Sequence, residues 1–252
     1  MRYIASLVFC FLIFGCSNEN TNEHSHKGHI LFIVSNQHTY GNTTINTANH
    51  FGEIVLAYDV FKKHNYNIDF VSPEGGAIPI GYISTSDSIH KHYIYDTEFM
   101  AKLKHTKTPK EVDPKKYLGV YYSGGGAAMF GVPENKPIQN ITSSIYKNDG
   151  VISAICHGSA GLVNVKDENG QYIYKDKEVN GFPDKFENMQ ADYYKTFPFS
   201  IEQRLNDGGG IFKYSENGWD NYYKVDGRLV TGQDPTASAS VAKAIINLLE
   251  SK

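Results

Sequence analysis

The stretch Val151-Ile-Ser-Ala-Ile-Cys-His-Gly-Ser-Ala160 joins the pattern of a buried strand to a single thiol. Five apolar or small residues lead into Cys156, and the small residues Ala154 and Gly158 stand two positions before and after it. This pattern is typical of a sharp strand-to-helix turn from which a side chain projects. Because the first amides of a helix carry partial positive charge, we expect them to favour the thiolate over the thiol. The stretch predicts a nucleophile at Cys156, with a plain buried cysteine as the alternative.

Outward from this stretch, short apolar runs alternate with segments of helical periodicity, which is the signature of a parallel sheet with helices on both faces. We therefore expect a flavodoxin-like α/β/α sandwich. In such sheets ligands bind at the carboxyl ends of the strands, where Cys156, residues 124–126 and residues 36–53 fall. The expected strands are residues 29–35, 68–72, 117–122, 151–155 and 227–231, and the expected helices are residues 51–61, a segment from Pro137, and residues 235–249.

The N-terminus has the features of an export signal. Met1-Arg2 precedes an apolar run that is too short for a comfortable membrane span. The run ends in Ile13-Phe-Gly-Cys16, which resembles the lipobox of bacterial lipoproteins, where cleavage precedes a cysteine that is then acylated. We expect residues 1–15 to be a lipoprotein signal peptide and residues 16–27 a polar tether, with an ordinary anchor or a cleaved secretory signal as alternatives.

Lipidation at Cys16 implies a protein of the bacterial cell envelope that a lipid anchor holds to the membrane. Ser17 after the cysteine favours the outer membrane. Cys10 leaves with the signal, so the mature chain has no pair of free thiols for an internal disulfide.

Residues 28–252 are about the length of one α/β domain. The formal charge of −3 and the pI near 6.4 give no electrostatic case for a nucleic-acid partner. A homodimer is left open, because no sequence feature requires it or excludes it.

The positions of the ten histidines restrict the chemistry of the thiol. None follows Cys156 except its neighbour His157, so a glutamine amidotransferase with a late histidine is excluded. A neutral imidazole can accept the thiol proton and return it later, which favours His157 as the base; a capping residue that points inward is the alternative. Such a base needs a carboxylate that orients it. Spacing alone leaves Glu187, Asp184 and Glu178 open.

Several motifs occur together and in a known order, and they cover nearly the whole of residues 28–252. On them the chain resembles the PfpI superfamily, also called the Parkinson-associated deglycase superfamily, which is class I glutamine amidotransferase-like in fold. Within it the chain is most similar to the branch of heat-shock chaperones and glyoxalase III. The motifs are Ala154-Ile-Cys-His-Gly158, Ser123-Gly-Gly-Gly-Ala-Ala-Met-Phe130, Phe70-Val-Ser-Pro-Glu-Gly-Gly76, Gly181-Phe182 with Glu187, Phe197-Pro-Phe199 and Asp226-Gly-Arg-Leu-Val-Thr-Gly-Gln-Asp-Pro235.

The resemblance implies a catalytic group of Cys156 as nucleophile, His157 as its partner and Glu187 as the carboxylate that orients the histidine. It also implies that Glu53 is the family's buried glutamate next to the cysteine, with a raised pKa that lets it relay a proton. Without the resemblance, Glu53 would be interpreted as a favourable charge at a helix start.

The resemblance further implies that the amides of Gly125 and Gly126, with that of His157, form an oxyanion site. Gly126 is also a departure, because many family members carry histidine at that position. No metal and no organic cofactor are implied. His90 and His92 are spaced to share one face of a strand, and we interpret them as surface histidines rather than metal ligands.

The function that the resemblance implies is conversion of a small 2-oxoaldehyde to a 2-hydroxy acid without glutathione, for example methylglyoxal to lactate. This is a glyoxalase III-like lyase, a cofactor-independent activity of the D-lactate dehydratase type. In this scheme His157 or Glu53 moves the proton between the two carbons. One alternative is a stress-protection holdase chaperone that uses the cysteine as a redox sensor. Another is a cysteine peptidase or amidase.

Overall fold

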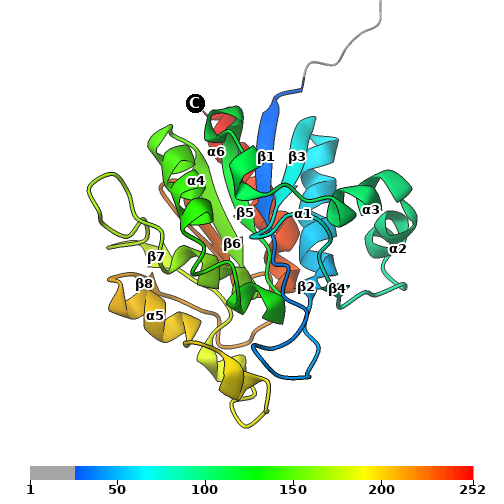
Figure 1. Cartoon of the computed structure of the whole chain (residues 1–252). Helices are drawn as coiled ribbons and strands as arrows, with labels where there is room; N and C mark the ends of the chain where they lie inside the picture. Colours follow the sequence, from blue (N-terminus) through cyan, green and yellow to red (C-terminus); the bar gives the residue numbers. More distant parts are fainter. Residues whose placement is uncertain (1–25, 252) are drawn as a thin grey trace, which may run out of the picture.

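The computed structural model describes residues 26–251. A six-stranded sheet runs through the centre in the order β3-β1-β5-β6-β10-β9, and all neighbours pair in parallel except β9 with β10 (Figure 1). This confirms the flavodoxin-like α/β arrangement. The strands are β1 (Gly28–Ile33), β3 (Tyr66–Val71), β5 (Tyr117–Tyr122), β6 (Val151–Ile155), β9 (Tyr223–Asp226) and β10 (Leu229–Gly232).

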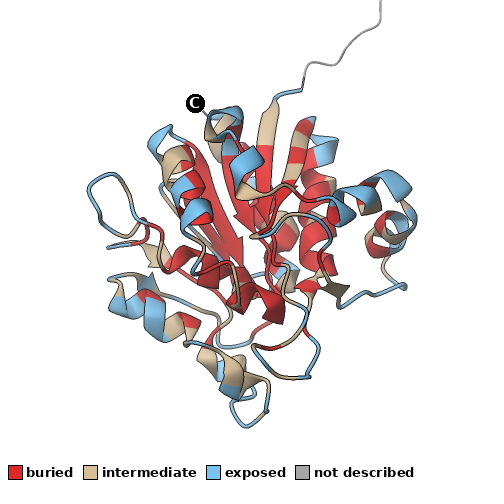
Figure 2. Cartoon of the chain, viewed as in Figure 1, coloured by how far each residue is buried: buried red, intermediate tan, exposed pale blue. Residues whose placement is uncertain are grey.

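Two apolar layers cover the two faces of the sheet. On one face α1 (Phe51–Lys63) and α6 (Ser238–Glu250) pack against each other and against residues such as Phe32 of β1. On the other face α4 (Lys136–Lys147) covers the sheet through Ile138, Ile141 and Ile145, which recur at helical spacing. Figure 2 shows the central strands, apart from the start of β1, and the inner sides of these helices as buried. The core therefore holds β1, β5 and β6 rigidly from both sides.

Smaller elements surround this sandwich. Helices α2 (Ser88–Tyr95) and α3 (Thr97–Lys104) lie beside α1. Helix α5 (Ile201–Asp207) lies on the other side of the molecule and contacts the turns that follow Cys156 (Figure 1). Two short parallel pairs complete the fold: β2 (Asn49–His50) with β4 (Ile80–Gly81), and β7 (Glu178–Val179) with β8 (Ile211–Phe212). The β2–β4 pair places the start of α1 at the carboxyl end of the sheet.

Three sequence predictions of local structure are wrong. The strand expected over residues 227–231 begins at Leu229, because Gly227 has φ +58° and forms the turn of a β9–β10 hairpin. Residues Cys156–Leu162 form 3₁₀-helical turns and not an α-helix. His90 and His92 lie on α2 and not on a strand.

Of the helices between residues 26 and 251, none has both the length and the apolar character needed to cross a membrane. The predicted signal peptide and the lipidation site at Cys16 lie outside the described residues.

Candidate active site

Cys156 lies where β6 ends, in the middle of the carboxyl edge of the sheet. Its φ is +54°, a left-handed conformation that non-glycine residues adopt at a cost and that often marks a functional turn. Gly158 makes the turn possible, because a Cβ there would stand 2.8 Å from the backbone of Ser123. The sharp turn that the sequence predicted is therefore present, with the thiol 4% exposed at residue level.

His157 and Glu187 form a hydrogen-bonded pair beside the thiol. His157 Nδ1 is 3.4 Å from Cys156 Sγ, and His157 Nε2 is 2.7 Å from Glu187 Oε1. Because an ionised carboxylate accepts from Nε2–H, we infer that Nδ1 carries the lone pair and faces the thiol. The ring is held by Phe182, which stacks on it at 4.8 Å between centroids, and by the edge of Phe197 at 5.5 Å.

The other two carboxylates that spacing left open are engaged elsewhere. Asp184 accepts a hydrogen bond from Ser200 Oγ at 2.7 Å, and Glu178 forms an ion pair with Lys224 at 2.8 Å. The structure thus brings Glu187, and neither of these, to His157.

Glu53 lies in the first turn of α1 and is completely buried. Its Oε2 accepts a hydrogen bond from the Gly124 amide at 2.6 Å, and the Cys156 thiol interacts with the same carboxyl group. Loss of solvation raises the pKa of Glu53 from 4.5 to about 8. A carboxyl group that stays protonated at neutral pH is not a charge that stabilises a helix start, so the alternative interpretation of Glu53 does not fit this site.

Two effects in the structure oppose the thiolate expected in the free protein. Burial raises the pKa of Cys156 well above its ordinary value, and ionisation of Glu53 raises it further. The His157 amide lowers it and does not compensate. The sequence shows that the His157 amide follows Cys156 at the turn, and this amide lowers the pKa of the thiol. The two effects that raise this pKa depend on how deeply the fold buries the thiol and on Glu53, which is distant in the chain. These directions favour a thiol that loses its proton when a substrate binds.

A cavity of about 260 Å³ opens over Cys156 and His157. Gly125 is one of its walls, whereas Gly126 does not line it and lies against Tyr40 and Thr47. The oxyanion role of the two glycine amides stays a prediction. The remaining walls are the side chains of His50, Tyr82, Phe182, Trp219 and Pro235, so the lining is mainly aromatic and apolar.

Sequence reasoning missed most of these walls. His50 could have been found, because it stands three residues before Glu53 at the expected helix start. Tyr82 and Trp219 have φ values of +59° and +46° in irregular segments, and no periodic pattern marks such positions. Within residues 26–251 no three histidine, cysteine, aspartate or glutamate side chains form a group that could hold a metal ion.

The interpretation of His90 and His92 is corrected in part. His90 is buried, and its Nδ1 accepts a hydrogen bond from the Ser84 amide, so it is not a surface histidine. His92 is exposed. Positions two apart on a helix point to different faces, so the two residues do not share a face.

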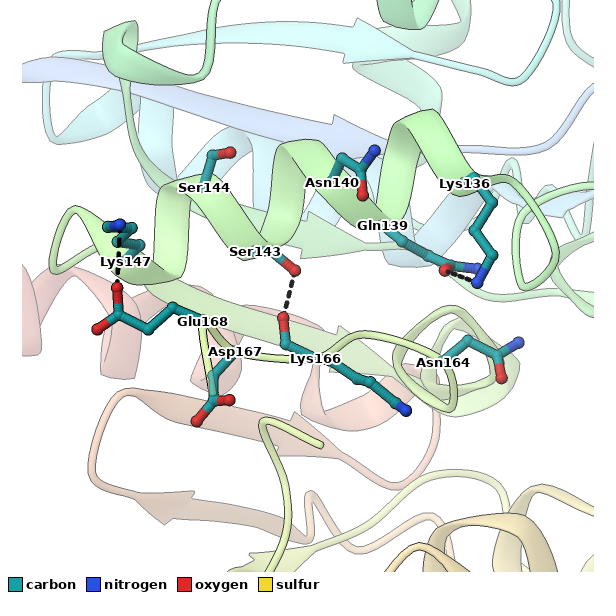
Figure 3. A pocket seen from close by; sticks show the side chains of 10 residues that line it. All are labelled: Lys136, Gln139, Asn140, Ser143, Ser144, Lys147, Asn164, Lys166, Asp167 and Glu168. Atoms are coloured by element: carbon teal, nitrogen blue, oxygen red, sulfur yellow. Dashed lines mark hydrogen bonds and ion pairs between the residues drawn. The ribbon is translucent and has the colours of Figure 1, made fainter. Parts of the chain in front are cut away.

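Figure 3 shows a second hollow, between α4 and residues 164–168, whose lining is polar. Two of its cations already have partners: Lys147 pairs with Glu168 at 3.0 Å, and Lys136 donates to Gln139 at 3.1 Å. It contains no buried titratable side chain, and we assign the chemistry to the cavity over Cys156.

Comparisons with known proteins show what the whole chain is similar to. The model of the DJ-1/PfpI family matches residues 50–248. A glutathione-independent glyoxalase of Schizosaccharomyces pombe is 30% identical over 220 residues, which cover 81% of this chain and 90% of that protein. A probable glutathione-independent glyoxalase of Saccharomyces cerevisiae is 33% identical over 211 residues, covering 79% and 88%. The crystal structure of glyoxalase III from Candida albicans superposes with a TM-score of 0.81 at 26% identity, covering 90% of this chain and 99% of that one.

Proposed function

This chain belongs to the DJ-1/PfpI family, and from that premise we propose that it is a lyase of the glyoxalase III type. It converts a small 2-oxoaldehyde such as methylglyoxal to the 2-hydroxy acid without glutathione. One observation carries the proposal: a thiol and an oriented imidazole line one apolar cavity, and a buried carboxyl group with a raised pKa lies against the thiol. The names of the relatives support the same reaction class.

The first step is addition of Cys156 to the aldehyde. The thiol proton passes to Nδ1 of His157, and Sγ forms a bond to C1 of the substrate. The electron pair of the C1 carbonyl moves to its oxygen, which takes the proton back and becomes the hydroxyl of a hemithioacetal. Glu187 accepts from Nε2–H at 2.7 Å and stabilises the imidazolium that forms between the two proton transfers.

The second step moves hydrogen from C1 to C2. His157 Nδ1 removes the proton from C1, the electron pair forms the C1–C2 double bond, and the π pair of the C2 carbonyl moves to its oxygen to give an enediolate. The proton of the C1 hydroxyl passes to the C2 oxygen, the C1 oxygen re-forms a carbonyl, and the C1–C2 π pair takes the proton back from His157 at C2. C1 is then the carbonyl of a thioester on Cys156. Water attacks this carbonyl, the bond to Sγ breaks, and the 2-hydroxy acid leaves. Glu53, which burial keeps protonated, carries to Sγ the proton that balances the one lost by the water.

The cavity suits a small neutral substrate. Its volume of about 260 Å³ exceeds that of a three-carbon molecule, and its walls are mainly aromatic and apolar. Among the described residues that line it there is no lysine or arginine that could bind a phosphate or a carboxylate. The reaction balances with one water and needs no external electron donor or acceptor.

The test uses a purified chain that begins at the predicted tether, incubated with methylglyoxal in the absence of glutathione. We expect lactate from the wild type and none above background from Cys156→Ala. A second assay follows aggregation of a client protein. If the wild type forms no lactate and both proteins suppress aggregation equally, the holdase alternative replaces this proposal.

The setting of the reaction is a separate proposal. We propose that Cys16 is acylated and holds the catalytic domain at the cell envelope, because residues 1–16 carry the pattern of a lipoprotein signal. The domain then removes oxoaldehydes at the membrane.

A further inference from the structure

His50 lines the cavity together with Cys156, yet the steps above do not use it. It is the N-cap residue of α1, and its Nδ1 accepts a hydrogen bond from the Glu53 amide at 3.3 Å. A neutral imidazole that accepts at Nδ1 carries its proton on Nε2. The cap therefore fixes the tautomer and makes Nε2–H the donor of this ring.

The surroundings keep this ring neutral. Burial lowers the pKa of His50 to about 4, and the neighbouring imidazoles of His90 and His157 lower it as well. The Tyr82 ring stacks on the imidazole, with 4.7 Å between centroids and an interplanar angle of 7°. The carboxyl group of Glu53, one turn along the helix, stays largely protonated and adds little charge at neutral pH.

Negative charge develops on the oxygen at C2 when the enediol forms, and the cavity must balance it. The other polar groups near C1 have tasks in the proposed reaction: Cys156 holds C1 and His157 moves the proton. Trp219, 57% exposed at residue level, lies at the mouth. The Tyr82 hydroxyl interacts with Tyr40. His50 is therefore the wall side chain that offers a fixed donor without a competing task.

We propose, on the basis of the proposed function, that His50 is a further catalytic residue whose Nε2–H donates a hydrogen bond to the C2 oxygen of the substrate. The bond strengthens as charge builds on that oxygen, so it stabilises the transition state more than the bound substrate. No proton leaves His50 during the cycle. Loss of one such preorganised donor in other enzymes slows turnover by about a hundredfold to a thousandfold.

The decisive variant is His50→Asn. Asparagine is a favoured N-cap residue whose side-chain oxygen can accept from the Glu53 amide, so the cap survives and the donor at Nε2 is lost. We expect kcat to fall by at least about tenfold, KM to change by less than about threefold, and urea unfolding to stay at the wild-type midpoint. His92→Asn, a change on the exposed side of α2, is the matched control.

A comparison of two further variants distinguishes the role of His50 as a hydrogen-bond donor from its role as the N-cap of α1. The amide nitrogen of Gln reaches about as far as Nε2, so His50→Gln should recover part of kcat, and His50→Leu should recover none. This second pair also decides the question if His50→Asn fails to fold. A purely structural role for His50 predicts wild-type kcat in His50→Asn and equal losses in the Gln and Leu variants, and either result overturns the proposal. If the wild type itself forms no lactate, the proposed function fails first and this role fails with it.

Discussion

Replacement of Glu53 by Gln should make the protein more stable at alkaline pH while it damages the site. The side chain is completely buried, and its oxygens face the Gly124 amide and the Cys156 thiol. Gln keeps the shape and an oxygen that accepts from Gly124, and it cannot ionise. The difference between the two proteins therefore reports the cost of the buried charge.

The sign follows from the raised pKa. Between pH 4.5 and about 8 the carboxyl group of Glu53 is protonated in the folded protein and ionised in the unfolded chain. The folded state holds one more proton, so the free energy of unfolding falls as pH rises, by about 1.4 kcal/mol per pH unit. Over the whole range from pH 4.5 to about 8, the free energy of unfolding can fall by at most about 5 kcal/mol. Relaxation of the protein around the ionised carboxylate lowers this change to about 2–4 kcal/mol.

The assay is urea unfolding of the wild type and Glu53→Gln at pH 4.5, 6 and 8. We expect the variant to gain about 2–4 kcal/mol relative to the wild type between the lowest and highest pH. Glu98→Gln is the control, because Glu98 occupies the first turn of α3 but is exposed. A constant difference between wild type and Glu53→Gln across the three pH values would refute the raised pKa and, with it, the protonated carboxyl group in the mechanism.

Three further outcomes test other parts of the account. Glu187→Gln should keep the fold and slow turnover by about a hundredfold or more, measured as lactate formed, because the imidazole loses its orienting charge; a loss below about threefold would contradict that role. Gly124→Ala should destabilise the protein by about 1–3 kcal/mol in urea, because its Cβ would stand 2.8 Å from Glu53 Oε2 and 2.9 Å from the His157 amide. Cys16→Ser should move the protein from the membrane fraction to the soluble fraction, and unchanged fractionation with the same mature mass would argue against lipidation.

The sequence predicted the elements that depend on continuous apolar runs. Strands β5 and β6 have the expected bounds, and β6 ends at Ile155 directly before Cys156, because buried parallel strands need apolar residues on both faces. Strand β9 escaped prediction, since it is short and exposed at alternate positions. The spacing of His90 and His92 also fits a strand, and spacing alone does not show that Asp87 caps a helix there.

The residues of the candidate site also divide into those that a local sequence pattern indicates and those that it does not. Cys156 and His157 are adjacent in the chain and carry a local pattern, so the sequence could indicate them. Glu187 and Glu53 depended on the family resemblance, because no local rule relates positions so far apart. The upward direction of the Cys156 pKa could not be predicted, since it depends on how deeply the fold buries Cys156 next to Glu53.

The most direct measurement of the central claim is the mass of the peptide that contains Cys156, recorded after acid quench during turnover of methylglyoxal. The account predicts an adduct with the mass of the substrate on Cys156, which appears in the first turnovers and disappears when methylglyoxal is exhausted, while lactate accumulates. Lactate formation without any adduct on Cys156, or at the wild-type rate in Cys156→Ala, would contradict the claim that this thiol carries the reaction.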